Sequence, residues 1–265
     1  MAVVALHTAA TGLSALNTQI DVIANNLANV NTTAFKAARV NFEDLLYQAK
    51  AQPGVMNANG DESPAGIFVG LGVRPANTDF NFEQGSPIDT GQPFDLMIDG
   101  NGFFRVECPE SPGGYAYTRA GNFFTNSDGE VVLGNRNGPR LADGITIPED
   151  AVAVTVLRDG TVEFSLAGGG SSQAEIQVTS FVNPKGLRPI GGNLWEETNA
   201  SGTPTEAQPG TGGAGEILQG FLEASNTNPV TELVEMIKAQ RAFEMNSQSI
   251  QAADQAMQVV ANLRR

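Results

Sequence analysis

Residues 6–30 read LHTAATGLSALNTQIDVIANNLANV, and the prediction of long terminal helices rests first on this stretch. Its apolar side chains recur with the 3-4 spacing of a coiled-coil seam. The seam residues are Leu6, Ala9, Leu13, Leu16, Ile20, Ile23, Leu27 and Val30. The other positions are mostly Thr, Ser, Asn, Gln and Ala, and the only formally charged residue before position 36 is Asp21. A helix facing water normally carries Lys and Glu on its outer side. The pattern therefore predicts a helix that is surrounded by protein on most sides.

The C-terminal part of the chain repeats this spacing. Its seam residues are Met236, Ala239, Phe243, Asn246, Ile250, Ala253, Met257 and Val260. A lone polar seam residue such as Asn246 can fix the register of paired helices. Asn228 is a suitable N-cap, and Pro229 suits the first helical position. We expect residues 1–35 and 226–265 to form a coiled-coil-like helical assembly domain.

Two arrangements satisfy these seams. One is an antiparallel helix hairpin inside a soluble monomer. The other is packing between copies of the chain, which the uncharged outer faces favour. Association of rigid bodies costs on the order of 4–15 kcal/mol, so a single helix pairing is marginal and a lattice with several neighbours per copy is stable. We expect Leu13, Ile20, Leu27, Phe243, Ile250 and Met257 to form the inner helical layer.

Between the helices the apolar period changes to the value of 2 that is typical of strands. Phe104, Val106 and Cys108 alternate with charged residues. Asp128-Gly129 and Asp159-Gly160 each separate two short apolar runs, which predicts hairpins with type I′ turns. We expect a β-rich outer domain at residues 94–184. The predicted fold class is α+β, with long N- and C-terminal helices flanking this central β-rich domain.

Residues 36–93 and 185–225 are predicted to form an extended connecting region. It contains an insert at residues 47–64 with Gln52-Pro53-Gly54, and a Gly-, Thr- and Pro-rich stretch at 199–215. Both read as linkers or long loops. Loops of this length within a domain are uncommon and are often functional.

Composition limits the function. The chain has 265 residues, a net charge of −14 and a pI near 4.4. This balance argues against binding to nucleic acid or to an anionic membrane surface. The sequence contains no run of eighteen apolar residues, so it predicts no membrane span. The N-terminal residues make a poor secretory signal. One cysteine, Cys108, excludes an internal disulfide framework.

Candidate chemistry is sparse. The single histidine, His7, lies between helical seam positions, which argues against a Ser/His/Asp triad. The Asp-Gly pairs are better explained as turns than as calcium ligands. We therefore predict no enzyme activity, cofactor or metal. One hypothesis of a different class stays open: Trp195, Glu196 and Glu197 are a combination found in sugar-cleaving clefts, so the chain would be a secreted β-rich module that binds or cleaves glycans.

Four stretches resemble one known family. Residues 23–36, IANNLANVNTTAFK, resemble the N-terminal signature of the bacterial flagellar rod and hook family, with Ala34 where Gly is common. Residues 98–104, IDGNGFF, and 117–123, YTRAGNF, resemble the entry to its β domain. Residues 225–246 resemble its closing helix. The resemblance covers nearly the whole chain in the family's order.

The resemblance implies a structural subunit that polymerises into a helical tube and transmits torque across the periplasm. The chain length, with FEDLLYQ at 42–48 and GLGVRP at 70–75, favours the distal rod; the alternative is another axial protein, of the hook or proximal rod. Terminal helices would form the inner tube and the β domain the outer wall. The insert at 47–64 would reach an axial neighbour.

The family further implies its partners: other copies of the chain, proximal rod and hook-type axial proteins, the P-ring and L-ring, and the flagellar export apparatus. It implies location in the flagellar basal body and export without a cleaved signal peptide. The asparagines of the signature either cap the helix end or bond neighbouring chains. The expected assembly interface comprises Leu6, Leu13, Leu16, Ile20, Ile23, Asn25, Asn26, Leu27, Asn29, Asn31, Phe35, Phe243, Asn246, Ile250 and Met257.

Overall fold

The computed structural model describes residues 2–54, 65–111, 113–148, 150–167 and 170–263. The chain divides into two compact units. The helical unit contains Met1–Ala28, Ala38–Phe80 and Asn228–Arg265, and the β unit contains Asn29–Ala37 and Asn81–Thr227. The predicted connecting region is therefore shared between the two units. The α+β class is confirmed, with terminal helices flanking a β-rich region.

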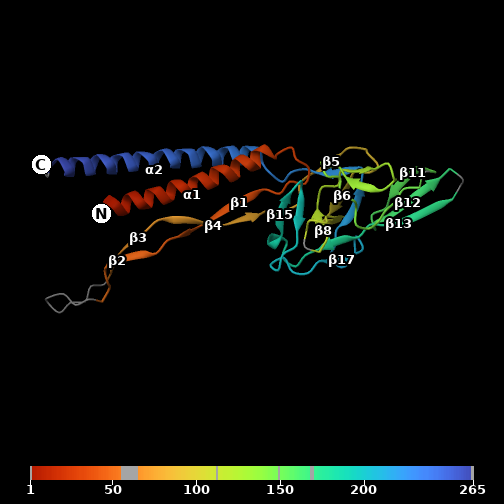
Figure 1. The fold of residues 1–265 in the computed structure, drawn as a ribbon, viewed down its shortest axis with the longest axis horizontal. Helices are drawn as coiled ribbons and strands as arrows, with labels where there is room; N and C mark the ends of the chain where they lie inside the picture. Colours follow the sequence, from red (N-terminus) through yellow and green to blue (C-terminus); the bar gives the residue numbers. More distant parts are fainter. Residues whose placement is uncertain (1, 55–64, 112, 149, 168–169, 264–265) are drawn as a thin grey trace. The chain divides into compact units, whose positions relative to one another are not determined.

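Two long helices run antiparallel and pack together in the helical unit (Figure 1). They are α1 (Ala2–Ala28) and α2 (Pro229–Leu263). The predicted cap of α2 is confirmed, because Asn228 Oδ1 accepts hydrogen bonds from the backbone N–H groups of Val230 at 3.0 Å and Thr231 at 3.4 Å. This satisfies donors that have no partner within the helix.

A two-stranded antiparallel ribbon completes the helical unit. β1 (Ala38–Asp44) pairs with β4 (Val73–Phe80), and β2 (Tyr47–Ala51) pairs with β3 (Ile67–Gly70). Both β1 and β4 pack against α1. The prediction of a loop was wrong for Tyr47–Ala51, because these residues have strand partners; residues 55–64 of the insert lie outside the described residues.

The ribbon also explains the uncharged back of α1. Thr11 Oγ1 accepts a hydrogen bond from Val73 N–H at 3.4 Å, and Ala15 is buried. Part of the surface that we expected to meet other copies of the chain is thus covered by the chain's own ribbon. Small and neutral side chains suit this position because a backbone strand approaches the helix closely.

The β unit is built from short strands and one 3₁₀ turn. Its elements are β5 (Pro87–Asp89), β6 (Leu96–Asp99), β7 (Phe104–Glu107), β8 (Tyr115–Thr118), β9 (Phe123–Thr125), β10 (Val131–Leu133), β11 (Ala151–Val156), β12 (Thr161–Leu166), β13 (Ser171–Glu175), β14 (Val178–Ser180), η1 (Pro184–Gly186), β15 (Arg188–Gly191), β16 (Leu194–Glu196), β17 (Thr205–Ala207), β18 (Glu216–Gln219) and β19 (Phe221–Glu223). The stretch at 199–215, expected to be a loop, contributes β17, which pairs with β14.

The strands form one four-stranded sheet, one three-stranded sheet and several antiparallel pairs. The larger sheet has the order β15-β16-β8-β7, and the smaller has β11-β12-β13. β18 pairs with β6, and β19 pairs with β5, so the C-terminal segment adds strands beside residues 87–99. One apolar core holds these strands together, and it includes Phe104, Phe123, Phe164 and Ile217.

The two predicted hairpins are confirmed, but their turn type was wrong. β9 pairs with β10, and β11 pairs with β12. A type I′ turn needs positive φ at both central residues. Gly129 and Gly160 have φ of +77° and +86°, but the preceding Asp128 and Asp159 do not have positive φ. Among the described non-glycine residues, only Ala34 and Asn193 do. Gly160 N–H donates to Leu157 C=O at 3.1 Å, which fits a three-residue loop ending in a left-handed glycine.

Candidate assembly surface

Helices α1 and α2 of the same chain pack together, and the described residues of the predicted seams on both helices are at least partly buried. Its α1 residues, Leu6, Leu13, Leu16, Ile20 and Leu27, are half-buried, and Ile23 is buried. Its α2 residues, Phe243, Asn246, Ile250 and Met257, are half-buried. A methyl group at Gly12 would lie 3.1 Å from Asn246 Nδ2, so the polar seam residue packs where α1 has no side chain. The seam is thus covered in part within one chain.

A second apolar stripe lies on α2 and was missed by the sequence reasoning. Val230, Leu233, Val234 and Ile237 are 68, 46, 46 and 52 % exposed, respectively. The last three follow Val230 by 3, 4 and 7 positions, which places all four on one face of the helix. This face lies away from the seam position Ala239, which is buried. Contiguous exposed apolar surface of this kind marks a site of protein contact. The same periodicity is visible in the sequence, alongside the stronger seam.

The ribbon exposes large apolar side chains as well. Leu46, Tyr47, Ile67 and Phe68 are 83, 59, 59 and 54 % exposed, respectively. They lie at or beside the paired strands β2 and β3, where Gln48 pairs with Val69 and Ala49 with Phe68. An exposed two-stranded ribbon with apolar side chains is marginally stable in water. It is therefore suited to being covered by another protein surface.

The asparagines of the signature have different surroundings. Asn26 is buried, and its side chain bonds both backbone groups of Ala38: Oδ1 accepts from N–H at 2.9 Å, and Nδ2 donates to C=O at 2.8 Å. Asn25 and Asn31 are exposed, and Asn29 Oδ1 accepts from the Thr32 hydroxyl at 3.1 Å. Asn26 thus aligns the start of β1 beside α1, a role that was not among the two we expected.

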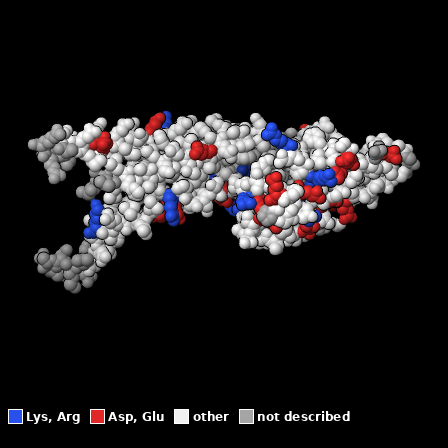
Figure 2. All heavy atoms as spheres, viewed as in Figure 1, with Lys and Arg blue, Asp and Glu red and all other residues white. Residues whose placement is uncertain are grey.

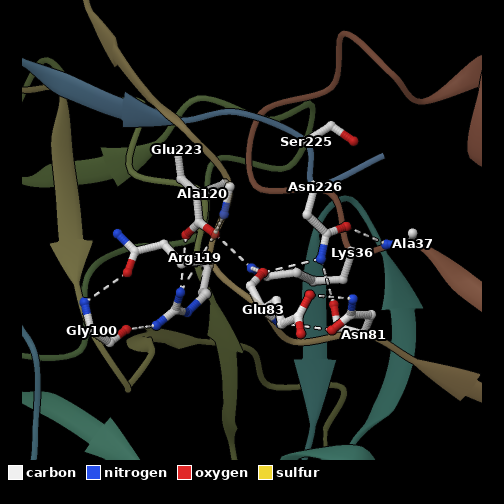
Figure 3. Close-up of polar contacts among 12 residues, drawn as sticks. Lys36, Ala37, Asn81, Glu83, Gly100, Arg119, Ala120, Glu223, Ser225 and Asn226 are labelled. Carbon is white, nitrogen blue, oxygen red and sulfur yellow. Dashed lines mark hydrogen bonds and ion pairs between the residues drawn. The ribbon is translucent and has the colours of Figure 1, made fainter. Parts of the chain in front are cut away.

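The motif residues of the β unit meet at a buried charge cluster, which we call the motif junction (Figure 3). It contains Phe35 and Lys36 of the N-terminal motif, Arg119 of YTRAGNF, Asn226 of the C-terminal motif, and Glu223, which precedes that motif. Lys36 Nζ lies 2.6 Å from Glu223 Oε1, and Arg119 Nη1 lies 3.2 Å from Glu223 Oε2. Phe35 is half-buried. Long-range pairing of this kind leaves no periodic signal in a sequence.

Burial dominates the electrostatics of this junction. It lowers the pKa of Lys36, and the Glu223 carboxylate opposes that effect. Burial also lowers the pKa of Arg119, again opposed by Glu223. Arg119 Nε donates to Gly102 C=O at 2.9 Å, and Arg119 Nη2 donates to Gly100 C=O. Buried charges that each make several hydrogen bonds hold chain segments in one arrangement.

The residues of the glycan-binding hypothesis are occupied by internal contacts. Trp195 is buried, and its ring centroid lies 4.9 Å from that of Phe82. Glu196 is buried and forms an ion pair with Arg188 at 2.5 Å, and Glu197 accepts a hydrogen bond from the Tyr117 hydroxyl at 3.2 Å. A buried indole offers no face on which a sugar ring could stack.

Charge is distributed unevenly over the chain. Most of the acidic residues belong to the β unit, and the view in Figure 2 shows few charged side chains over α1 and α2. Neither helix of the described residues has the length and hydrophobicity needed to cross a membrane.

Comparison with known proteins identifies the family to which the chain belongs. Residues 6–36 match the family "Flagella basal body rod protein", residues 97–164 match "Flagellar hook protein FlgE/F/G D1 domain", and residues 218–263 match "Flagellar basal body rod FlgEFG protein C-terminal". The flagellar basal-body rod protein FlgG of Caulobacter vibrioides is 44% identical over 98% of this chain and 99% of its own length. The chain belongs to the flagellar basal-body rod family.

Two further relatives indicate which rod protein this chain resembles most. FlgG of Borreliella burgdorferi is 40% identical over 98% of both chains. FlgF of Caulobacter vibrioides is 38% identical and covers 86% of this chain and 84% of its own. The chain is thus a structural rod subunit similar to the distal rod protein, and not an enzyme. Family membership implies self-polymerisation within the rod, beside other axial proteins, in the flagellar basal body.

Proposed function

We propose that this rod subunit builds the distal rod as an open helical homopolymer that transmits torque across the periplasm. A heterologous contact, in which two different surfaces of the same chain meet, generates such a polymer when its rotation does not close. In this proposal the helical units of many copies form the tube, α1 and α2 pack as a coiled-coil-like pair, and the β units form the outer wall.

The observation that carries the proposal is the apolar stripe of α2. Val230, Leu233, Val234 and Ile237 remain about half exposed or more although α1 already covers the opposite face of the helix. Burying one such side chain stabilises a contact by about 1.5–3 kcal/mol at full burial. A stripe repeated on every copy offsets the free-energy cost of association only when each copy has several neighbours.

The ribbon is proposed to provide a second contact, between axial neighbours. Leu46, Tyr47, Ile67 and Phe68 offer the apolar area; Tyr47 is the first residue of the insert at residues 47–64, and the other three lie close to its ends. A contact along the axis in addition to those of the helices would stiffen the shaft, because bending then requires two sets of contacts to open.

The remaining partners are proposed from family membership. They are proximal rod and hook-type axial proteins at the two ends of the distal rod, the P-ring and L-ring around it, and the flagellar export apparatus. Periplasmic location and export without a cleaved signal peptide belong to the same proposal. The acidic β unit supports a freely turning shaft, because surfaces of high net charge resist adhesion.

The test places a charge on the stripe. Ile237→Asp changes an exposed side chain, so the free energy of unfolding of the monomer, measured by thermal unfolding, should change by about 0.5 kcal/mol or less. Burying an unpaired carboxylate between copies is strongly unfavourable. We expect cells that carry Ile237→Asp as their only copy to assemble no distal rod in electron micrographs and to be non-motile.

Ser249→Asp is the matched control, because position 249 is exposed on the same helix but lies off the stripe. We expect this variant to swim. Normal swimming and normal rods with Ile237→Asp would remove the stripe from the assembly contact.

A further inference from the structure

Residues 29–37 follow α1 directly in the sequence but belong to the β unit, and we call them the strap. Their backbone makes three hydrogen bonds with residues 221–227, while Ala37 C=O accepts from Asn81 N–H at 2.9 Å and Thr33 C=O accepts from Asn193 Nδ2 at 3.2 Å. Ala34 N–H donates to Glu223 C=O at 2.8 Å, and Ala37 N–H donates to Asn226 Oδ1 at 2.8 Å. Asn226 N–H donates to Phe35 C=O at 3.3 Å. The strap therefore docks on a segment that is distant in sequence.

The side chain of Lys36 anchors the strap inside the β unit. Its Nζ lies 2.6 Å from Glu223 Oε1 and 2.7 Å from Glu83 C=O. The side chains of Lys36 and Glu223 are each 1 % exposed, and that of Arg119 is 4 % exposed. Figure 3 shows Glu223 between the two cations. Glu223 Oε1 also accepts from Gly85 N–H at 2.9 Å.

This arrangement makes docking of the strap depend on Glu223. An ammonium group without a partner is excluded from a buried site by the loss of its hydration. Arg119 already occupies the junction, and its charge disfavours a second cation nearby. Glu223 is the only acidic side chain that forms an ion pair with Lys36 among the described residues. Without it, the strap would have to bury Lys36 against another positive charge.

We propose that the strap is a conformational latch, which closes on the β unit only when residues 221–227 are docked and Glu223 is in place. Lys36 and Glu223 are 187 positions apart. The strap follows α1 in the sequence, and residues 221–227 precede α2. Closing the latch therefore fixes the chain segments at the ends of both helices together, so a chain with an undocked C-terminal segment keeps its N-terminal segment free as well. This inference does not depend on the proposed polymer contacts.

Glu223→Gln tests the latch, because glutamine retains the shape and an acceptor for Arg119 but loses the charge. Hydrogen exchange by mass spectrometry would follow the strap amides, and trypsin would report access to the Lys36–Ala37 bond. We expect exchange of the strap and cleavage after Lys36 to accelerate at least about tenfold, since removing one partner of a buried pair is costly. Glu216→Gln, at an exposed carboxylate that pairs with Arg158, is the control and should change neither rate.

Lys36→Met separates a latch from a general loss of stability. With the cation absent, Glu223→Gln should accelerate strap exchange much less than it does with Lys36 present. If Glu223→Gln alone unfolds the β unit, as read from Trp195 fluorescence, the double variant Lys36→Met/Glu223→Gln should restore the fold. The proposal is overturned if Glu223→Gln behaves as Glu216→Gln does. It is equally overturned if the acceleration is the same in both Lys36 backgrounds, or if the double variant stays unfolded.

Discussion

Gly72 lies directly against Thr11, so closely that a Cβ atom on Gly72 would stand 2.1 Å from Thr11 Oγ1. Gly72 also has φ of +123°, a conformation that L side chains rarely adopt. It separates β3 from β4, where the ribbon meets α1. The absence of a side chain at this one position lets the ribbon approach the helix, and this explains the second glycine in GLGVRP.

Gly72→Ala should therefore destabilise the helical unit by about 2–4 kcal/mol, through backbone strain and the clash with Thr11. Urea denaturation followed by circular dichroism measures this loss. Gly91→Ala is the control, because Gly91 has φ of +63° and nothing within 4 Å of the added Cβ. It should lose only about 1 kcal/mol. Thr11→Ala in the Gly72→Ala background should recover part of the loss, and no recovery would show that the clash is unimportant.

Asn26→Ala removes two hydrogen bonds at once and leaves both backbone groups of Ala38 buried without their partner. We expect a loss of about 2–4 kcal/mol in the free energy of unfolding. Asn17→Ala, at an exposed position of α1, should be neutral or slightly stabilising because alanine is the better helix former. Equal stabilities of the two variants in the same denaturation experiment would contradict the role given to Asn26.

The Tyr117 hydroxyl should make stability fall in alkali. Burial, aided by the Glu197 charge, raises the pKa of Tyr117 above its ordinary value of 10.0. Above about pH 10 the unfolded chain releases this proton and the folded chain retains it, so the stability contributed by the neutral hydroxyl is present below pH 10 and lost as pH rises. Tyr117→Phe should reduce the slope of stability against pH in that range by up to about 1.4 kcal/mol per pH unit. An unchanged slope would show that another group causes the alkaline loss.

Periodic features of the chain were predictable from sequence. The seams from Leu6 to Leu27 and from Met236 to Met257 indicated both helices, and Asp128-Gly129 and Asp159-Gly160 indicated two hairpins, because local spacing decides such elements. The turn type was not predictable from the dipeptide alone. Whether the glycine is the last residue of a two-residue or of a three-residue loop depends on strand register, which neighbouring strands set.

Contacts between distant segments were not predictable. Lys36 and Arg119 stand in two separate motifs and Glu223 lies just before a third, and nothing in their spacing shows that they share one buried site. Ala34 is intermediate between these cases. Glycine is common at this position in the family signature, which suggests a left-handed residue, and Ala34 has φ of +55°. The structure adds that its methyl group belongs to the β-unit core, where glycine would leave a gap.

In the proposed rod, the α2 stripe contacts other copies of the chain. A photo-crosslinking phenylalanine analogue at position 237 tests this contact, because it keeps the site apolar and captures whatever lies against it. Irradiation of intact basal bodies should yield a product of twice the chain mass of 27.8 kDa, with peptides of two copies joined at residue 237. Fully assembled basal bodies that yield no joined copies from position 237 would show that the stripe does not contact another copy.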